Sequence, residues 1–178
     1  TVNKSNHDKI LQLKALNKQI IGLKIKVCRQ IVNKKIVDFC KILPKSKNNA
    51  KFGKETGLYP FFTSSNNVKS YVDVPDVNNE SLIIGDGGEP NINYGINFSA
   101  SDHCFVLQNN EDKEVNLKYV YYYIHNNLDL LSKHYKGVGI KNMSKTKIGE
   151  IAIPILPLEQ QESIVSYCDA NMKTIKEL

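Results

Sequence analysis

The stretch IAIPILPLEQQESIV, residues 151–165, joins two kinds of sequence pattern end to end. In its first half, three isoleucines alternate with other residues, as the side chains on one face of a β-strand do. In its second half the composition is that of a helix, with glutamates in the first turns, where the helix dipole favours negative charge. Pro154 and Pro157 bracket the exit from the strand, because proline cannot donate to a central ladder. The stretch predicts a strand over 148–155 that leads directly into a helix over 158–178.

Composition places the chain among folded proteins of ordinary size. It has 178 residues, of which 41% are hydrophobic and 24% charged, enough for one domain and an additional element. No apolar run approaches the roughly 18 residues of a membrane span, and the polar start TVNKSNHDK does not resemble a signal peptide. The four cysteines are widely scattered, which suits a reducing compartment. These features predict a soluble cytoplasmic protein.

The net charge of +6 is unevenly distributed along the chain. Residues 1–54 contain 14 lysines and arginines but only two acidic residues, whereas acidic residues outnumber basic ones in the remainder. A strongly basic front end indicates an anionic partner. A solvated lysine face on a long helix explains the same charges equally well.

The longest periodic segment runs from residue 8 to about residue 39, and it predicts a long helix. Its apolar residues are spaced alternately by three and four positions, as in the seam of a coiled coil. These residues are Leu13, Leu16, Ile20, Leu23 and Val27. Such a helix is a rod of roughly 45 Å at about 1.5 Å per residue, and it should project from a domain of this size. The helix over 158–178 has a similar seam of Val165, Cys168, Met172 and Ile175. We expect the two helices to pair antiparallel.

Between these helices, short strand patterns alternate with turns rich in asparagine, glycine and proline. The strand patterns cover residues 59–63, 69–74, 81–84 and 104–107. A helical pattern follows over 117–131, with Asn116 placed to cap its start and Gly137 its end. The four tyrosines of this helix point in several directions, which favours core packing over a base-stacking platform.

The predicted fold class is therefore α+β, a small mixed α/β domain flanked by two long helices that form an antiparallel coiled coil. Residues 1–40 form the first long helix, 41–157 the domain, and 158–178 the start of the second helix. The apolar seams predict that the helices connect or dimerise subunits.

No catalytic or metal-binding constellation is visible in the sequence. Glycines follow a strand pattern in LIIGDGGEPN, residues 82–91, but no Lys-Ser/Thr pair completes a P-loop, and the third glycine of a dinucleotide fingerprint would fall at Pro90. His103 and Cys104 are adjacent, and neighbouring strand residues point to opposite faces. The sequence predicts a chain without catalytic residues, bound metal or cofactor of its own.

Four segments in a fixed order resemble the target-recognition domain of the specificity (S) subunit of type I restriction–modification enzymes. They are ILPKSKNNAKFGKETGLYPFFTSSNNV, SLIIGDGGEPN with INFSASDHCFVL, Gly137 with GIKNMSKTKI, and KTKIGEIAIPILPLEQQESIV. In that family the domain ends on a strand, an I-P-x-x-P-L-x-x-Q junction and a long helix. The matching junction residues are Ile153, Pro154, Pro157, Leu158, Glu159 and Gln161. The resemblance covers residues from about 40 to 178.

The resemblance implies sequence-specific recognition of double-stranded DNA, in which this domain reads one half of a bipartite target. The antiparallel helices would act as a spacer and as the docking site of methyltransferase (M) subunits. Those subunits would carry S-adenosylmethionine and methylate adenine N6, with a restriction (R) subunit as an optional further partner. The chain itself would be non-catalytic.

The chain departs from the family pattern in one respect, because a full specificity subunit has two such domains. The sequence is therefore compatible with a fragment, with a half-subunit that forms a homodimer through its helices, or with the recognition part of a larger methyltransferase. The second helical seam is still in register at Leu178, which favours a fragment.

On this interpretation, two lysine clusters contact phosphates and short polar loop residues read base edges. The expected phosphate contacts are Lys45, Lys47, Lys51 and Lys54, and Lys136, Lys141, Lys145 and Lys147. The expected base-edge contacts are Ser64, Ser65, Asn66, Asn91, Asn93 and Asn142. Any one of these asparagines, taken singly, is also a common turn residue.

Two other functions remain open from the residues alone. The chain is compatible with a coiled-coil interaction module whose α/β domain binds protein or RNA, in which case the lysine loops are incidental. It is also compatible with an enzyme that binds a phosphate-bearing substrate at residues 85–91 and uses Asp102 and His103.

Overall fold

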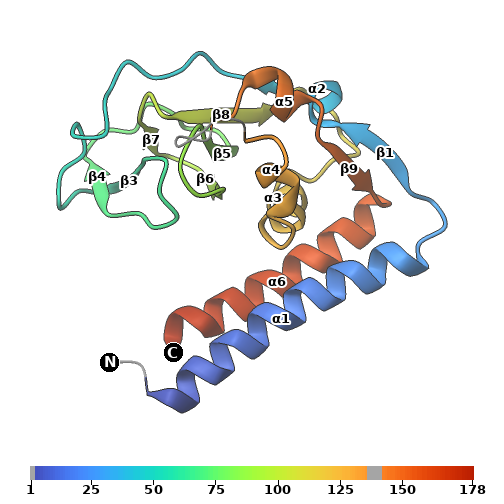
Figure 1. The fold of residues 1–178 in the computed structure, drawn as a ribbon. Helices are drawn as coiled ribbons and strands as arrows, with labels where there is room; N and C mark the ends of the chain where they lie inside the picture. The colour runs from blue at the N-terminus through green and yellow to red at the C-terminus, as the bar shows by residue number, and fades with distance from the viewer. Residues whose placement is uncertain (1–2, 136–141) are drawn as a thin grey trace.

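The computed structural model describes residues 3–135 and 142–178. Two long helices, α1 and α6, lie side by side along one edge of the molecule, and a mixed α/β domain sits on them (Figure 1). The chain enters the domain from α1 and leaves it into α6, so the start of α1 and the end of α6 lie at the same end of the helix pair (Figure 1). Among the described residues, none of the helices is both long and apolar enough to cross a membrane. The predicted α+β class with flanking helices is confirmed.

Helix α1 is Lys4–Val27 and begins at an N-cap formed by the side chain of Asn3. The prediction of one helix as far as residue 39 is wrong beyond Val27. The chain instead forms strand β1, Val32–Lys35, which pairs antiparallel with strand β9, Ala152–Ile155. The partner of β1 lies far along the chain, so the pairing that ends the helix leaves no trace in local periodicity.

Two polar contacts align α1 with α6, Leu158–Glu177. The side-chain amide of Asn171 donates a hydrogen bond to Asn17 Oδ1 at 2.7 Å, and Asn17 is buried. Near the ends of the helices, the side-chain amide of Asn6 donates to the carbonyl of Leu178 at 3.3 Å. Of these two α1 residues, the earlier one, Asn6, contacts the later position at the end of α6, and Asn17 contacts the earlier position. The helices therefore run antiparallel.

The predicted seam on α6 agrees with the observed burial. Cys168 is fully buried, and Val165 and Met172 are half-buried against the main core. Ile175 is half-buried as well. Burial also raises the pKa of the Cys168 thiol to about 12, so this thiol stays protonated at neutral pH.

The predicted seam on α1 is displaced around the helix. Leu16, Leu23 and Val27 are exposed, by 41%, 57% and 71% respectively, so they do not face α6 within this chain. Leu13 and Ile20 are half-buried, whereas the buried residues of α1 are Asn17 and Ile21. Helix α1 therefore has two apolar stripes. The stripe containing Ile21 joins the core, and the prediction selected the other because spacing alone does not distinguish them.

A four-stranded antiparallel sheet forms the centre of the domain, in the order β2-β8-β5-β6. After the short helix α2, Ile36–Phe39, these strands are β2 (Cys40–Ile42), β8 (Cys104–Asn109), β5 (Ser81–Gly85) and β6 (Ile92–Gly95). A smaller sheet has the order β4-β3-β7, with β4 (Ser70–Val72), β3 (Tyr59–Phe62) and β7 (Ser99–Ala100). All four predicted strand patterns form strands, and β1, β2, β6 and β7 are additional ones.

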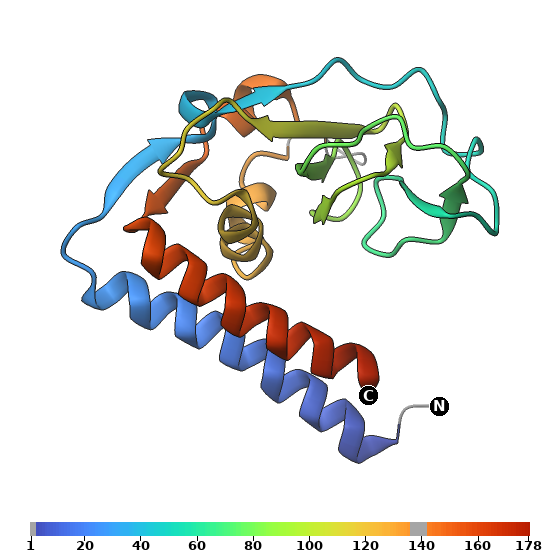
Figure 2. The same cartoon turned by 180° about the vertical axis from the view of Figure 1, so that it is seen from behind.

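Helix α3, Leu117–His125, lies between the larger sheet and the helix pair (Figures 1 and 2). Tyr119 and Tyr122 are buried, so the predicted core packing of the tyrosines is confirmed for these two. Asn116 caps the helix as predicted, by accepting a hydrogen bond from the backbone N–H of Tyr119 at 3.1 Å. Gly137, the predicted cap at the other end, lies outside the described residues.

The helix predicted over 117–131 is broken in two. Helix α3 ends at His125, and a separate short helix, α4, covers Asp129–Ser132. At the break, the side-chain amide of Asn126 donates to the carbonyl of Tyr122 at 2.8 Å. The amide of Asn127 makes the corresponding bond one residue further on, at 2.7 Å to Tyr123. Such bonds offer the backbone an alternative to continuing the helix.

The domain closes through helix α5, Lys145–Gly149, and strand β9. The predicted strand over 148–155 is therefore wrong in its first residues, where Ser144 instead caps a helical turn. After β9, the proline junction leads into α6 as predicted. Gln161 at this junction is fully buried and joins the segment before α3 to the end of β9. Its Oε1 accepts from the N–H of Asn116 at 2.8 Å, and its Nε2 donates to the carbonyls of Glu114 and Leu156, each at 2.7 Å.

An ion pair joins β1 to the loop before α3 and gives a testable pH dependence. Lys34 Nζ lies 2.7 Å from Asp112 Oδ2, and both side chains are about 20% exposed. The hydrogen bond to Lys34 lowers the pKa of Asp112 below its ordinary value, and the bond to Asp112 raises the pKa of Lys34.

We expect Asp112→Asn to lower the free energy of unfolding by about 0.5–1 kcal/mol at pH 7, as for a partly exposed ion pair. Because the folded-state pKa of Asp112 is depressed, its contribution is fully present above the unfolded-state pKa of about 3.9 and is lost as the pH falls through the folded value. Urea unfolding at pH 7 and pH 3 should therefore show a smaller difference between variant and parent at pH 3 than at pH 7. An equal difference at both values would contradict this account.

Candidate nucleic-acid interface

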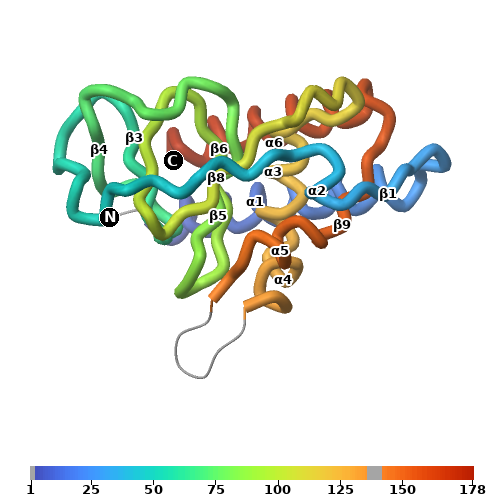
Figure 3. The backbone as a smooth tube through the Cα atoms, turned by 90° about the horizontal axis from the view of Figure 1, so that it is seen from above, coloured from blue at the N-terminus to red at the C-terminus, as the bar shows by residue number. Residues whose placement is uncertain are grey.

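The first predicted lysine cluster lies on the segment that follows β2. This segment runs along the side of the domain farthest from the helix pair (Figures 1 and 3). Lys45 Nζ is 2.5 Å from Asp86 Oδ2, and Lys54 Nζ is 2.9 Å from Asp73 Oδ2, so carboxylates already hold both cations. Lys47 and Lys51 are exposed and make no ion pair with any described residue. The latter two are therefore the stronger candidates for phosphate contacts.

Residues 142–143 contact the turn after β5, where Lys45 of the first predicted cluster also lies. The side chain of Asp86 binds Lys45, and its carbonyl accepts from the N–H of Met143 at 2.7 Å. Asn142 is exposed beside this turn, where it forms an isolated bridge with Gly87. The turn at Asp86 therefore brings one predicted lysine and one predicted base-edge residue to the same place.

The four lysines of the second predicted cluster divide into two pairs. Lys145 is exposed and Lys147 half-buried in α5, just after the cap formed by Ser144. Lys136 and Lys141 lie outside the described residues.

The predicted base-edge residues do not all face solvent. Asn91 is only 3% exposed, and its amide donates to the carbonyls of Ser64 and Glu89, both at 2.9 Å. Its buried Oδ1 has no hydrogen-bond partner among the described residues. The expected base contact by Asn91 is therefore corrected, because the side chain holds the turn after β5 against the loop after β3.

The loop after β3 contains three further candidates. Ser65 exchanges weak hydrogen bonds with the backbone of Asn67, each at 3.3 Å, and thereby shapes a local turn. Asn66 is exposed at the tip of this turn, and Ser64 is half-buried at its start. Asn93 is half-buried in β6, opposite Ile83.

A cleft of about 940 Å³ lies between the domain and the helix pair. The domain side contributes Asn66, Asn91 and Asn93, which are half of the predicted base-edge set. The helix side contributes Lys14 and Lys176, which the sequence interpretation did not include. The residues that line the cleft also include tyrosines of three elements, Tyr71, Tyr94 and Tyr121. Among the described lining residues there is no acidic side chain.

Burial shifts the pKa values of two tyrosines and one histidine of the cleft. Burial raises the pKa of Tyr94 and of Tyr121, so both hydroxyls stay protonated. Burial and the neighbouring ammonium of Lys14 lower the pKa of His125, so its imidazole is neutral. Lys14 and Lys176 are thus the cationic side chains that line the cleft, and at its edge the hydroxyl of Tyr94 donates a hydrogen bond to the carboxylate of Glu80 at 2.5 Å.

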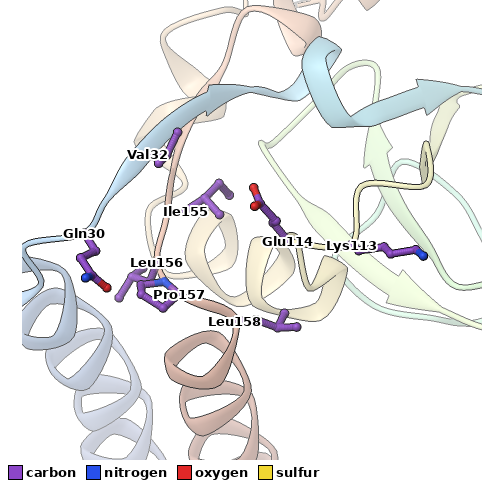
Figure 4. A pocket seen from close by; sticks show the side chains of 8 residues that line it. All are labelled: Gln30, Val32, Lys113, Glu114, Ile155, Leu156, Pro157 and Leu158. Atoms are coloured by element: carbon purple, nitrogen blue, oxygen red, sulfur yellow. The ribbon is translucent and has the colours of Figure 1, made fainter.

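Another cavity, of about 310 Å³, lies where α1 ends and α6 begins (Figure 4). Its lining is mainly apolar, and Lys113 and Glu114 contribute one charge of each sign. It contains none of the predicted site residues, and its balanced charge does not suit a polyanion. In the ranges 3–135 and 142–178, no group of three or more histidine, cysteine or acidic side chains could hold a metal ion.

Comparison with known proteins gives a consistent result. The sequence profile of the type I restriction modification DNA specificity domain matches residues 29–177. A putative type I restriction enzyme specificity subunit from Haemophilus influenzae is 29% identical over 121 residues, which is 65% of this chain and 30% of that protein.

Solved structures resemble the fold over nearly the whole chain. A type I restriction–modification S subunit from M. genitalium superposes with a TM-score of 0.68 at 14% identity, over 97% of this chain and 47% of the other. The HsdS subunit from Thermoanaerobacter tengcongensis gives 0.63 at 14% identity, over 98% and 46%. A chain from a structure of type I restriction–modification complex assembly gives 0.66 at 15% identity, over 98% and 47%. This chain thus spans less than half the length of each of these proteins.

Proposed function

Because the chain belongs to the type I restriction modification DNA specificity domain family, we propose that it recognises double-stranded DNA and reads one half of a bipartite target sequence. The observation that carries the proposal is the family match over residues 29–177, which includes the whole domain and all of α6. The fold shared with specificity subunits supports the same conclusion.

The residues offered to DNA fall into two roles. Lys47, Lys51 and Lys145 are exposed cations that would contact phosphates and fix the position of the duplex. Asn66, Asn93 and Asn142 have side-chain amides that donate and accept, which suits the reading of base edges. Ser64, Ser65, Lys147 and the ion-paired Lys45 and Lys54 would have a smaller part, because they are half-buried or already engaged.

Catalysis would reside in partner subunits. The chain would present DNA to methyltransferase (M) subunits that carry S-adenosylmethionine and methylate adenine N6, with a restriction (R) subunit as a further partner, all in the cytoplasm. The exposed stripe of Leu16, Leu23 and Val27 on α1 is the surface that such a subunit, or a second copy of the chain, would cover.

The test is direct binding, measured by fluorescence anisotropy with labelled duplex DNA, duplex RNA and single-stranded DNA, followed by sequence selection from a random duplex library. We expect preferential binding of duplex DNA and enrichment of one short motif. Equal binding of all three nucleic acids, or preferential binding of RNA, would replace DNA recognition by the interaction-module alternative.

The double variant Lys47→Ala, Lys51→Ala should weaken binding to all duplex sequences alike. Loss of two phosphate contacts should reduce the slope of log K against log salt concentration by about 1.8, at about 0.9 per contact. Sequence preference should not change, because phosphate contacts do not read sequence. A titration over a range of salt concentrations measures the slope, and an unchanged slope would remove both lysines from the interface. The matched control is Lys35→Ala with Lys69→Ala, two exposed lysines outside the predicted clusters.

A further inference from the structure

We propose that the flanking helices bind DNA phosphates themselves, through Lys14 of α1 and Lys176 of α6. On this proposal the backbone of one DNA strand lies in the cleft between the helix pair and the domain. The inference rests on the DNA recognition proposed above. It goes further, because it makes the helices a wall of the binding site in addition to a spacer.

The antiparallel packing of the helices brings these two lysines to one cleft. Lys14 lies in the first half of α1 and Lys176 in the last turn of α6, yet both line the same 940 Å³ cleft. Asn66 and Asn93 line it from the domain side. A strand seated there would have cations along one side and amide groups along the other.

Cations continue along the helix pair on both sides of the cleft. Lys18 lines a neighbouring cavity of about 470 Å³, which shares His125 and Leu128 with the cleft. Lys173 lines a further cavity of about 360 Å³, which shares Met172 and Lys176 with it. Each neighbouring cavity also has one aspartate in its lining, Asp129 or Asp169, so of these three cavities the cleft alone has no acidic side chain among its described lining residues.

Lys14 and Lys176 differ in their ion pairing from four other lysines of the chain. Lys34, Lys45, Lys54 and Lys118 each form an ion pair with an aspartate at 2.5–3.0 Å. Neither Lys14 nor Lys176 forms an ion pair with a described residue. A cleft whose charged side chains are all cationic concentrates field lines and attracts a polyanion.

The size of the cleft indicates how DNA would occupy it. A volume of about 940 Å³ is near the upper end of the roughly 300–1,000 Å³ that is typical of pockets for small ligands. That space admits a stretch of one sugar-phosphate backbone but not a whole duplex. The helices would therefore contact the edge of a duplex whose grooves face Asn66 and Asn93 on the domain side of the cleft.

The experiment compares two double variants that remove the same charge from the helices. Lys14→Gln with Lys176→Gln removes the cleft lysines. Lys9→Gln with Lys26→Gln removes two exposed lysines of α1 that do not line any of the described cavities. The probe is a fluorescein-labelled duplex of random sequence, titrated with the full 178-residue chain over a range of salt concentrations. We expect the slope of log K against log salt to fall by about 1.8 in the first variant, at about 0.9 per phosphate contact, and to stay unchanged in the second.

A second readout does not depend on substitutions. Lysines of the unmodified chain are acetylated with and without excess duplex and are then identified by mass spectrometry. Lys14 and Lys176 should be protected by DNA, whereas Lys9 and Lys26 should react equally in both samples.

If the parent chain binds duplex but the two double variants share one slope, or Lys14 and Lys176 remain fully reactive, the inference is overturned and recognition by the domain stands. If the parent chain does not bind duplex at all, the proposed function itself fails.

Discussion

Replacing Gln161 by leucine is expected to lower the free energy of unfolding by about 3 kcal/mol, because three partly or fully buried backbone hydrogen bonds are lost at roughly 1 kcal/mol each. The side chain of Gln161 is completely buried. It accepts from the N–H of Asn116 and donates to the carbonyls of Glu114 and Leu156. Leucine has a similar volume but neither donates nor accepts, so the loss is one of hydrogen bonding rather than of packing. For a domain of ordinary stability, about 5–15 kcal/mol, this is a large fraction.

The neighbouring residue supplies the control for this prediction. Gln160 is half-buried, and its side chain makes no hydrogen bond with the described part of the chain. Gln160→Leu should therefore change stability by less than about 0.5 kcal/mol, as surface substitutions usually do. Urea unfolding followed by circular dichroism measures both variants. If Gln161→Leu costs no more than Gln160→Leu, the junction glutamine does not hold the fold together in the way its contacts indicate.

Substituting alanine for Gly53 should cost about 2 kcal/mol, within the range of 1–3 kcal/mol for overpacking. A Cβ atom at this position would lie 2.5 Å from Ser70 Cβ and 2.6 Å from Phe61 Cδ1. Phe61 is only 1% exposed in the core of the smaller sheet, so it has little room to move. The glycine is needed here because the segment before β3 lies directly against β4, where Lys54 and Tyr71 form an antiparallel bridge.

The same substitution at Gly22 should have the opposite sign. No atom lies within 4 Å of a Cβ placed at Gly22, which lies inside α1. Alanine should therefore stabilise the protein by up to about 1 kcal/mol, the difference in helix propensity between the two residues. Melting temperatures of the two variants should move in opposite directions from that of the parent. A shift in the same direction for both would show that the local environments do not determine the outcome.

The parts of the fold that sequence predicted well are those specified by neighbouring residues. The junction from strand to helix depends on Pro154, Pro157 and the composition of the next turns, all within one short stretch. The strand patterns at 59–63 and 81–84 are bounded by turn residues that end them locally. The cap at Asn116 likewise acts on an N–H three residues away.

The predictions that failed depend on residues distant in the sequence. Strand β1 exists because it pairs with β9, and the apolar residues after Val27 suit a helix equally well until that partner is known. The exposed Leu16 and the buried Ile21 have similar hydrophobicity, and only the placement of the domain and α6 distinguishes them.

The candidate site was only partly predictable for the same reason. Asn91 was selected as a polar loop residue, and its burial became evident only when the loop containing Ser64 was placed over it. Lys14 and Lys176 had no local feature to mark them, because the cleft they line is created by packing between the domain and both helices. Residue type indicated the chemistry correctly, whereas tertiary structure determined which residues are available for it.

The ribbon of β1 and β9 has a mechanical consequence. The chain passes between the helix pair and the domain twice, and the two crossings are hydrogen-bonded to each other from Val32↔Ile155 to Lys35↔Ala152. Two separate linkers would let the domain swivel, but here a rotation must first break ladder bonds. Torque exerted on the domain by a bound duplex would therefore be transmitted to α1 and α6 with little rotation of the domain relative to the helices.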